Sequence, residues 1–370
     1  MFWQSLMFFI CRYLRISVVN KKHMKQILLL PAFQEFIRVS TKGKRRTASG
    51  KRLTQGTVQQ YQVVLQYLQS FETTLPQAIR IQLLYRQTQR QFQQEANYWK
   101  KIKLALEQYL RKQHNCLDVY IAAVFKVLKT FFNYLRKEKG LPVGEFHRQF
   151  RLPSYQYQPV LIDTFQLQRL IHDHNFRNSL QKHLAESLDL FVVGCLVGLR
   201  YIDLINLKKT SLSVRNDQYY LQVLTQKTGT QVNIPLPGYA VEIIDRLKQK
   251  RTAYLFKRIS NTNFNLHLKQ MMELAGYTYS VPKMRYSQGR LTEIKTKEGN
   301  SFRFCDHISS HTMRRTAITN LLVLGVPEMV VRKISGHAAG SKEFYRYISL
   351  AQDYTNRHLT DAYDKLLKTA

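Results

Sequence analysis

Residues 309–337 read SSHTMRRTAITNLLVLGVPEMVVRKISGH, and they decide the fold of the second half of the chain. Apolar residues recur at helical spacing from Thr312 to Leu324, and Gly325 ends that helix. A second helix begins at Pro327 and ends at Gly336. The spacing predicts that the inward-facing residues of the two helices are Ala317, Ile318, Leu321, Leu324, Val330, Val331 and Ile334.

The polar residues of the same stretch predict an anion site. His311 and Arg314 are three residues apart at the start of the first helix, so their side chains project to the same side. The amino end of a helix also favours an anion such as phosphate. His337 directly follows the second helix, so three hydrogen-bond donors can converge where two helix ends meet.

Further donors lie upstream of this stretch. Arg200 follows the apolar helix LDLFVVGCLVG (188–198), and Asp203 is close enough to hold or orient it. A second arginine fits because a pentavalent phosphoryl transition state has two non-bridging oxygens to neutralise. Lys227 lies in a turn, QKTGT (226–230), between two predicted strands, QYYLQVLT (218–225) and QVNIPLP (231–237). A lysine on a turn tip can protonate a leaving oxygen, and a tyrosine can supply a nucleophile.

In this order the motifs GLRYIDL, QKTGTQVNIPL, HTMRRT, ISGH and FYRYI resemble the tyrosine recombinase (phage integrase) family, and within it the integrases of mobile elements. The resemblance implies that Arg200 and Arg314 hold the scissile phosphate, and that His337 hydrogen-bonds one of its oxygens. His311 would bind the phosphate and help to activate the tyrosine, Lys227 would act as general acid, and Asp203 would support Arg200. It further implies a 3′-phosphotyrosyl bond that stores the energy of the broken strand, so that no metal, ATP or other cofactor is needed.

The nucleophile departs from the family pattern. It usually falls nine residues after the histidine of the GH motif, but here that position is Arg346, between Tyr345 and Tyr347. Family members often read aromatic-x-x-Tyr-Ile, which selects Tyr347 over the alternative, Tyr345. A loop can absorb one extra residue while the hydroxyl keeps its place in space, so we predict Tyr347 as the nucleophile.

Composition favours a nucleic-acid partner. The chain has 370 residues, which predicts two domains, and a net charge of +33 from 57 Lys+Arg against 24 Asp+Glu. With 22 Tyr and 20 Phe it is not a disordered basic tail, so double-stranded DNA is favoured over a membrane surface. The four cysteines form no CxxC pair, which indicates a reducing compartment; we expect a cytoplasmic protein of bacterial type.

The predicted fold is mainly α with a small antiparallel β-sheet in the catalytic domain, in two domains that clamp DNA. Residues 1–45 are expected to be an N-terminal extension and basic arm; Arg12 and Arg15 interrupt its apolar start, which argues against a membrane anchor. Residues 46–140 are expected to be a helical core-binding domain without strands, 141–159 a linker, and 160–370 the catalytic domain. The residues predicted to bind DNA phosphates are Lys42, Lys44, Arg45, Arg46, Lys51, Arg52 and Arg315, although residues 40–54 also fit a solvated linker.

Four alternatives compete. A zinc site at Cys305, His307 and His311 lacks a second ligand pair. A helix-turn-helix regulator at 312–336 would expose Glu328, Arg332 and Lys333, few of them base-reading types, and leaves Arg200 and Lys227 unexplained. A DNA-binding protein that has lost catalysis and a type IB topoisomerase-like enzyme are the other two.

The expected partners are DNA attachment sites and further copies of the chain. The C-terminal segment LTDAYDKLLKTA (359–370) predicts a short amphipathic helix. It could pack on its own domain or, as the resemblance implies, dock into a neighbouring protomer to build a homotetramer on two DNA sites. A directionality factor or a DNA-bending protein is a possible further partner.

Overall fold

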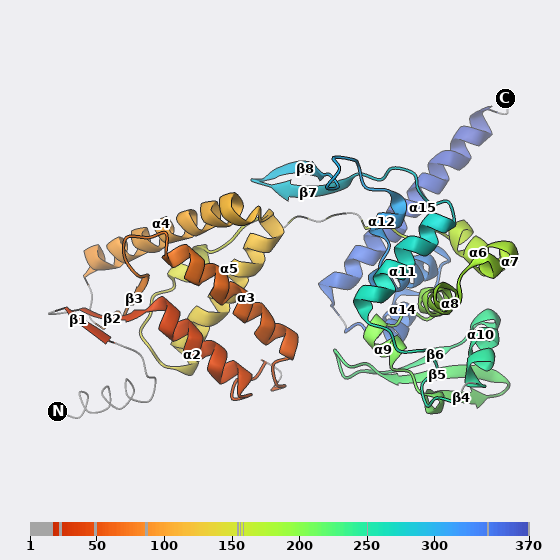
Figure 1. The fold of residues 1–370 in the computed structure, drawn as a ribbon, viewed down its shortest axis with the longest axis horizontal. Coiled ribbons are helices and arrows are strands. Elements are labelled where there is room, and N and C mark those ends of the chain that lie inside the picture. The colour runs from red at the N-terminus through yellow and green to blue at the C-terminus, as the bar shows by residue number, and fades with distance from the viewer. Residues whose placement is uncertain are drawn as a thin grey trace. The chain divides into compact units, whose positions relative to one another are not determined.

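The computed structural model describes residues 18–21, 24–47, 50–85, 88–153, 155, 157, 159–249, 251–338 and 340–368. The chain divides into two compact units (Figure 1). Unit 1 comprises Met1–Gln156 and Met284–Thr292; unit 2 comprises Tyr157–Lys283 and Glu293–Ala370. The apolar start, residues 1–17, lies outside the described residues. Within the described ranges no helix is long and apolar enough to cross a membrane.

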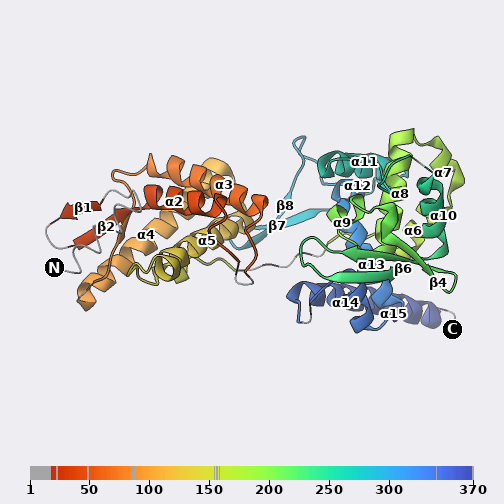
Figure 2. The same ribbon diagram turned by 90° about the horizontal axis from the view of Figure 1, so that it is seen from below.

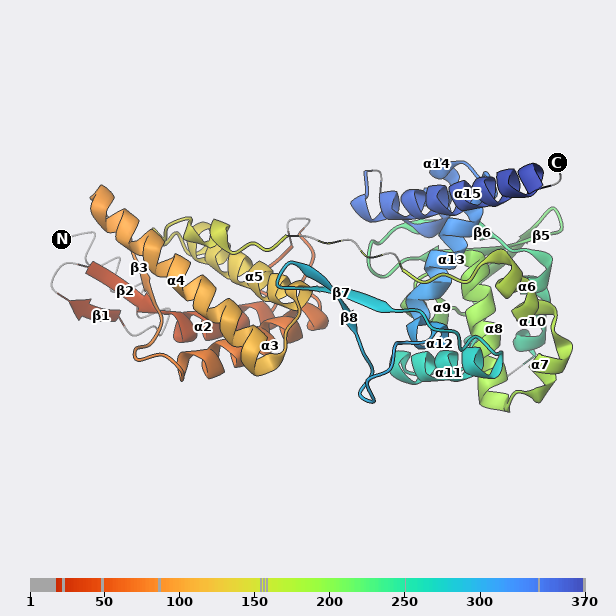
Figure 3. The ribbon, with the colours of Figure 1, turned by 90° about the horizontal axis from the view of Figure 1, so that it is seen from above.

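Unit 1 combines helices with a small antiparallel sheet. Its strands are β1 (Val18–Lys21), β2 (Met24–Leu28) and β3 (Arg80–Gln82), in that order across the sheet. Its principal helices, among which α4 is the longest (Figure 3), are α2 (Leu29–Thr41), α3 (Gln55–Glu72), α4 (Gln89–His114) and α5 (Asp118–Asn133). A π-helical turn, η1 (Tyr134–Glu138), and a 3-10 turn, η2 (Phe146–Gln149), follow. The helices predicted from residues 57 and 118 are confirmed, but β3 lies where no strand was expected.

The helical domain begins earlier than residue 46, so that predicted boundary is wrong. Helix α2 buries Phe33 and Phe36 in the core of unit 1, where both rings pack on Phe131 with centroids 5.0 and 5.6 Å apart. The stretch LLPAFQEFI carries apolar residues at helical spacing, which was the missed signal. Residues 29–41 are therefore part of the domain core rather than of an extension.

Arg45 is not a free phosphate-binding residue, which corrects a second prediction. Its side chain is only 7% exposed and forms a bidentate ion pair with Glu138 over 2.7–3.0 Å. Its guanidinium also stacks on the rings of Phe36 and Tyr134, 4.6 and 5.1 Å from their centroids. The other predicted phosphate-binding residues of this segment are exposed: Lys42, Lys44, Arg46, Lys51 and Arg52.

Unit 2 is mainly helical with one small antiparallel sheet, as predicted. Its strands β4 (Leu212–Arg215), β5 (Gln218–Leu224) and β6 (Gln231–Pro235) pair in that order; β4 was not predicted. Helices α6 (Thr164–His172), α7 (His174–Ser179), α8 (Lys182–Val197) and α9 (Tyr201–Ile205), and the turn η3 (Lys209–Ser211), precede the sheet. The helices that follow it are α10 (Gly238–Lys248), α11 (Asn261–Leu274), α12 (Phe304–His307), α13 (Ser310–Val323), α14 (Glu328–Ser335) and α15 (Lys342–Lys368).

A hairpin interrupts the catalytic half of the sequence. Strands β7 (Lys283–Ser287) and β8 (Arg290–Ile294) pair with each other, and most of this hairpin, Met284–Thr292, belongs to unit 1. The amides at its tip donate to the Asp118 carboxylate, from Gln288 over 3.0 Å and from Gly289 over 2.9 Å. Unit 2, which holds most of the predicted catalytic domain (residues 160–370), is therefore made of two separate stretches of sequence.

Helix α8 forms the centre of unit 2 and packs on α13. At Gly194 a Cβ atom would lie 2.4 Å from the Met313 sulfur, so glycine permits this close approach. Helix α15 runs beside α13, and α14 packs near β6 (Figure 2). Two residues predicted to face inward do not. Leu324 is 70% exposed at the C-cap of α13, and Val330 is exposed because Val331 and Ser335 form the buried face of α14. The described part of the C-terminal segment, residues 359–368, is the end of α15, not a separate short helix.

Candidate active site

The carboxyl end of α8 brings the two predicted arginines together. Gly198 ends α8 in the left-handed conformation, with φ of 69°, and Arg200 then precedes the first turn of α9. The Gly198 carbonyl accepts a hydrogen bond from Nη1 of Arg314, over 2.9 Å. The turn after α8 therefore holds the α13 arginine directly, and Arg200 lies two residues away along the chain.

Arg314 is a buried cation with a directed fork. The residue is 4% exposed, and burial together with repulsion from Arg200 lowers its pKa to about 10. The nearby hydroxyl of Tyr347 partly offsets this shift. The second arm of the guanidinium, Nη2, lies 3.0 Å from Nε2 of His337. Asp203 also offsets part of the repulsion between the two arginines, and a bound anion would offset more of it.

The hydrogen bonds of His337 fix its tautomer. Ser335 Oγ donates its single proton to the Val331 carbonyl, so it accepts from Nδ1–H of His337, over 2.8 Å. Nε2 then keeps its lone pair and accepts from Arg314. Burial, followed by repulsion from Arg314 and Arg200, lowers the pKa of His337 to about 3, so the ring is neutral at physiological pH.

A tight turn carries Lys227 near His311 and His337. The amide of Thr225 donates to the Thr230 carbonyl over 2.9 Å, and the amide of Gly229 donates back to Thr225 over 2.8 Å, which leaves Lys227 exposed on the turn. Lys227 and Arg200 both contribute to the lowered pKa values of His311 and His337. The turn lysine thus lies in the same electrostatic environment as the helix residues.

Asp203 supports the lysine turn. Its Oδ1 accepts a hydrogen bond from the Gln226 amide over 2.8 Å, although Asp203 was predicted to support Arg200. Asp203 Oδ2 and Arg200 Nη1 are both buried and make no hydrogen bond to the described part of the chain. Sequence reasoning missed Gln226, because it acts through a backbone amide, which no side-chain pattern reveals.

His311 lies in the first turn of α13, near enough to Arg314 for that charge to act on its ring. Desolvation of its ring, and then the charges of Arg315 and Arg314, lower its pKa. His311 is therefore neutral near pH 7 and can accept a proton. Arg315, predicted to contact DNA, is partly buried beside it.

The two tyrosines have different surroundings. Tyr347 is half-buried, and its ring centroid lies 5.7 Å from that of His337. Tyr345 is 55% exposed and lies under the guanidinium of Arg332, 5.1 Å from the ring centroid. The structure therefore brings Tyr347, and not Tyr345, to the cluster of Arg200, Lys227, His311, Arg314 and His337, which we call the cationic cluster.

The predicted alternatives fit the geometry less well. Within the described ranges, no three His, Cys, Asp or Glu side chains are grouped to hold a metal ion. His307 Nε2 bonds to the Val281 carbonyl over 2.8 Å, so this nitrogen is engaged in the protein. As for a helix-turn-helix, α13 is largely buried, and Arg332, expected to be exposed on α14, packs against rings of α15.

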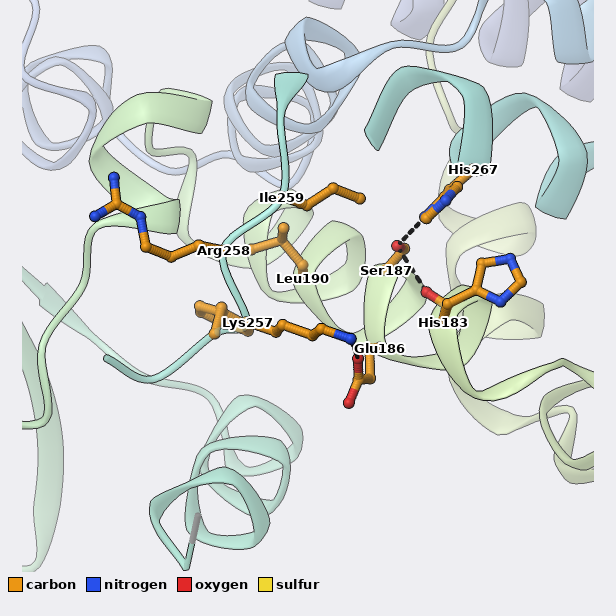
Figure 4. Close-up of a pocket in the computed structure, with 9 residues that line it drawn as sticks. His183, Glu186, Ser187, Leu190, Lys257, Arg258, Ile259 and His267 are labelled. Atoms are coloured by element: carbon orange, nitrogen blue, oxygen red, sulfur yellow. Dashed lines mark hydrogen bonds and ion pairs between the residues drawn. The ribbon is translucent and has the colours of Figure 1, made fainter. Parts of the chain in front are cut away.

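A pocket of about 190 Å³ lies elsewhere in unit 2 and shares no residue with the cationic cluster (Figure 4). Ser187 donates to the His183 carbonyl over 2.9 Å and so accepts from Nδ1–H of His267, over 2.8 Å. Because the hydroxyl proton is used by the backbone, Ser187 is not activated as a nucleophile. Lys257 and Glu186 both line this pocket and form an ion pair at 3.6 Å.

The sequence matches a known protein family and known relatives. The model of the phage integrase family matches residues 160–353. The tyrosine recombinase XerC of Bacillus licheniformis is 25% identical over 249 residues, which cover 64% of this chain and 74% of XerC. Transposase B from transposon PsiTn554 of Staphylococcus aureus is 26% identical over 217 residues, 57% of this chain and 31% of the transposase.

Solved structures share the fold. The Tn1549 transposon integrase in complex with transposon right end DNA superposes with a TM-score of 0.57 at 13% identity, over 90% of this chain and 99% of that one. The XerH site-specific recombinase bound to palindromic difH substrate gives 0.56 at 12% identity, over 89% and 84%.

The family match spans more than half of the chain, so the chain belongs to the phage integrase family. Within that family it is a tyrosine-type site-specific DNA recombinase that resembles the integrases of mobile elements.

Proposed function

We propose that this recombinase cuts and rejoins DNA through a 3′-phosphotyrosyl intermediate at Tyr347. The observation that carries the proposal is the place of Tyr347 beside His337 and Arg314. The general-acid candidate Lys227 is near enough to lower the pKa of the same histidine. Two arginines and two histidines can hold a phosphate, and a phenol beside them can attack it, which is the set of groups that phosphoryl transfer requires.

In the forward step the Tyr347 oxygen attacks the scissile phosphorus and a bond forms between them. The phenolic proton passes to His311, which is available as the acceptor because its lowered pKa keeps the ring neutral. The bond from phosphorus to the 5′-oxygen breaks, and Lys227 protonates that oxygen as it leaves. The reverse reaction with the 5′-hydroxyl of another strand rejoins the DNA. Bond energy is conserved in the phosphotyrosine, so neither metal nor ATP takes part.

Phosphate binding requires a rearrangement of one hydrogen bond. Arg314 Nη2 now donates to His337 Nε2. A phosphate oxygen can take that donor, because its charge makes it the stronger acceptor. His337 can then rotate or gain a proton and donate to a second oxygen. The Gly198 carbonyl keeps the other arm of Arg314 fixed during the exchange.

Affinity for double-stranded attachment sites would come chiefly from phosphate contacts, because the net charge is +33. The candidates for these contacts are the exposed cations Lys42, Lys44, Arg46, Lys51 and Arg52, and Arg315 in unit 2.

We further propose a homotetramer on two DNA sites, with the end of α15 as the docking element and a directionality factor or DNA-bending protein as an accessory. Leu359 and Tyr363 of that helix are exposed apolar residues.

A nicked suicide substrate that carries the end of the mobile element tests the proposal, since the released fragment diffuses away and traps the covalent complex. Wild type, Tyr347→Phe and Tyr345→Phe are compared. We expect a covalent band that only Tyr347→Phe removes, and that a chelator leaves unchanged. Loss only with Tyr345→Phe would reassign the nucleophile, and absence of a band despite firm DNA binding would overturn the mechanism. Joined products from two sites, rather than relaxed circles, separate recombination from topoisomerase activity.

A further inference from the structure

The first turn of α15 is held by one side chain of α14. The Arg332 guanidinium lies 4.4 Å from the ring centroid of Phe344 and 5.1 Å from that of Tyr345. Phe344 is fully buried with Val331 and Ile318, and its ring also meets His337 edge-on at 5.2 Å. Arg332 therefore covers two consecutive rings at the start of the helix that carries the candidate nucleophile.

Arg332 is itself fixed at three points. Its Nε donates to Glu328, one turn earlier on α14, over 2.6 Å, and Nη2 contacts the same carboxylate. Its backbone carbonyl accepts from the amide of His337, over 3.0 Å. The side chain is only 13% exposed, and an arginine is rarely buried unless its charge is paired, as this one is with Glu328. One residue thus joins the backbone of His337 to the first turn of α15.

We propose that Arg332 is a positioning residue that sets the rotation of α15 so that Tyr347 faces Arg314 and His337. The proposal rests on the function proposed above. Tyr345 then has a defined role as the ring under the guanidinium, and its hydroxyl is dispensable. Cation–π contacts suit this task because they fix a ring face while they tolerate solvent at the edge.

The rotation matters because the two tyrosines are alternatives on one helix. Residues two apart differ by about 200° around a helix axis, so Tyr345 and Tyr347 point to nearly opposite sides. Phe344 and Tyr347 are three apart and share a face. A clamp on Phe344 and Tyr345 therefore selects Tyr347 for the cationic cluster and keeps Tyr345 outside it.

The test measures the single-turnover rate of covalent complex formation at saturating suicide DNA, together with DNA affinity and the midpoint of thermal unfolding. We expect Arg332→Met and Tyr345→Leu each to slow the rate about tenfold. Tyr345→Phe keeps the ring and should retain the rate within about twofold, and Arg332→Lys should give an intermediate value. The double variant Arg332→Met with Tyr345→Leu should be no slower than the slower single variant, because both changes remove one interaction.

Lys333→Met is the matched control. It removes one positive charge from the same helix, but Lys333 is exposed and its charge lies over no ring among the described residues. We expect it to weaken DNA binding without a change in the rate at saturation. A wild-type rate for Arg332→Met, a loss equal to that of Lys333→Met, or additive losses in the double variant would each overturn the proposal.

A second measurement is independent of DNA chemistry. Tyrosine nitration of the free protein, mapped by mass spectrometry, reports the exposure of each phenol. Wild type and Lys333→Met should nitrate Tyr345 well before Tyr347, and Arg332→Met or Arg332→Lys should raise nitration of Tyr347 severalfold. Unchanged nitration would overturn the clamp even if cleavage fell. Conversely, a wild-type protein without any covalent complex but with this nitration pattern would overturn the proposed function and leave the clamp standing.

Discussion

Arg314 and His337 lie against each other: Nη2 of the arginine is 3.0 Å from Nε2 of the histidine. Two groups that would both bind phosphate are thus already held against each other, with the Gly198 carbonyl behind the arginine and Ser335 behind the histidine. The Gly198 carbonyl fixes one arm of the arginine, so phosphate binding need exchange only the hydrogen bond between Arg314 and His337.

Replacement of Arg314 by lysine should lower the rate of covalent complex formation by about 100-fold or more. Lysine keeps the charge but cannot donate to Gly198 and to a phosphate through one rigid fork. DNA affinity should change little, because many other cations contact the backbone. The rate is measured on the suicide substrate at saturating protein. Cleavage by Arg314→Lys within a few-fold of wild type would contradict the assigned role.

Lys227→Ala should block release of the 5′-oxygen, and a substrate with sulfur in place of that bridging oxygen should restore cleavage. A thiolate leaves without protonation, so it does not need the general acid. Arg200→Ala is the control, since loss of transition-state charge stabilisation is not repaired by sulfur. Equal rescue of both variants, or of neither, would argue against Lys227 as the acid.

Asp203→Ala should resemble Lys227→Ala, because Asp203 holds the lysine turn through the Gln226 amide. We expect a rate loss of about tenfold and partial rescue by the same sulfur substrate. Asp203→Asn retains an oxygen acceptor for that amide and should lose less. If Asp203→Ala is not rescued, its role lies at Arg200 instead.

The free energy of unfolding should fall as the pH drops from about 6.5 toward 3. His337 has a pKa of about 3 in the folded state, below its ordinary value of 6.5, so the unfolded chain binds a proton more readily in this window. The stability is fully present above pH 6.5, and one such group contributes a slope of up to about 1.4 kcal/mol per pH unit. His337→Gln should reduce the slope, measured by denaturant titration at several pH values. An identical slope in the variant would show that the histidine is not shifted.

Arg45→Met should destabilise unit 1 by about 1–3 kcal/mol, since it leaves Glu138 without its partner and uncovers Phe36 and Tyr134. Arg46→Met, one residue further on, alters an exposed side chain and should leave stability unchanged. Instead it should lessen the salt dependence of DNA binding. Thermal unfolding and salt titrations compare the two variants. If Arg45→Met and Arg46→Met lowered the free energy of unfolding equally, the buried ion pair assigned to Arg45 would be contradicted.

Much of the candidate site is predicted by the spacing of residues along the sequence. The spacing of His311 and Arg314 on one helix face, the start and end of α13 and α14, and the strands that flank Lys227 are local properties that periodicity and turn residues predict. The helices that begin near residues 57 and 118 were predicted for the same reason. Three local elements were not predicted. Helix α2 has an apolar face at helical spacing, whereas β3 and β4 are short strands with weak alternation of apolar and polar residues.

The sequence by itself determined which residue types are present, their order, and the helix faces on which they lie. Only the tertiary structure decided which partners they meet across elements: Asp203 with the Gln226 amide, Arg45 with Glu138, and Arg332 with the rings before Tyr347. The reason is physical. Spacing along the chain fixes an angle around one helix, whereas a contact between helices depends on how both pack, and packing is set by the whole core. The choice between Tyr345 and Tyr347, two residues apart on α15, depends on that packing.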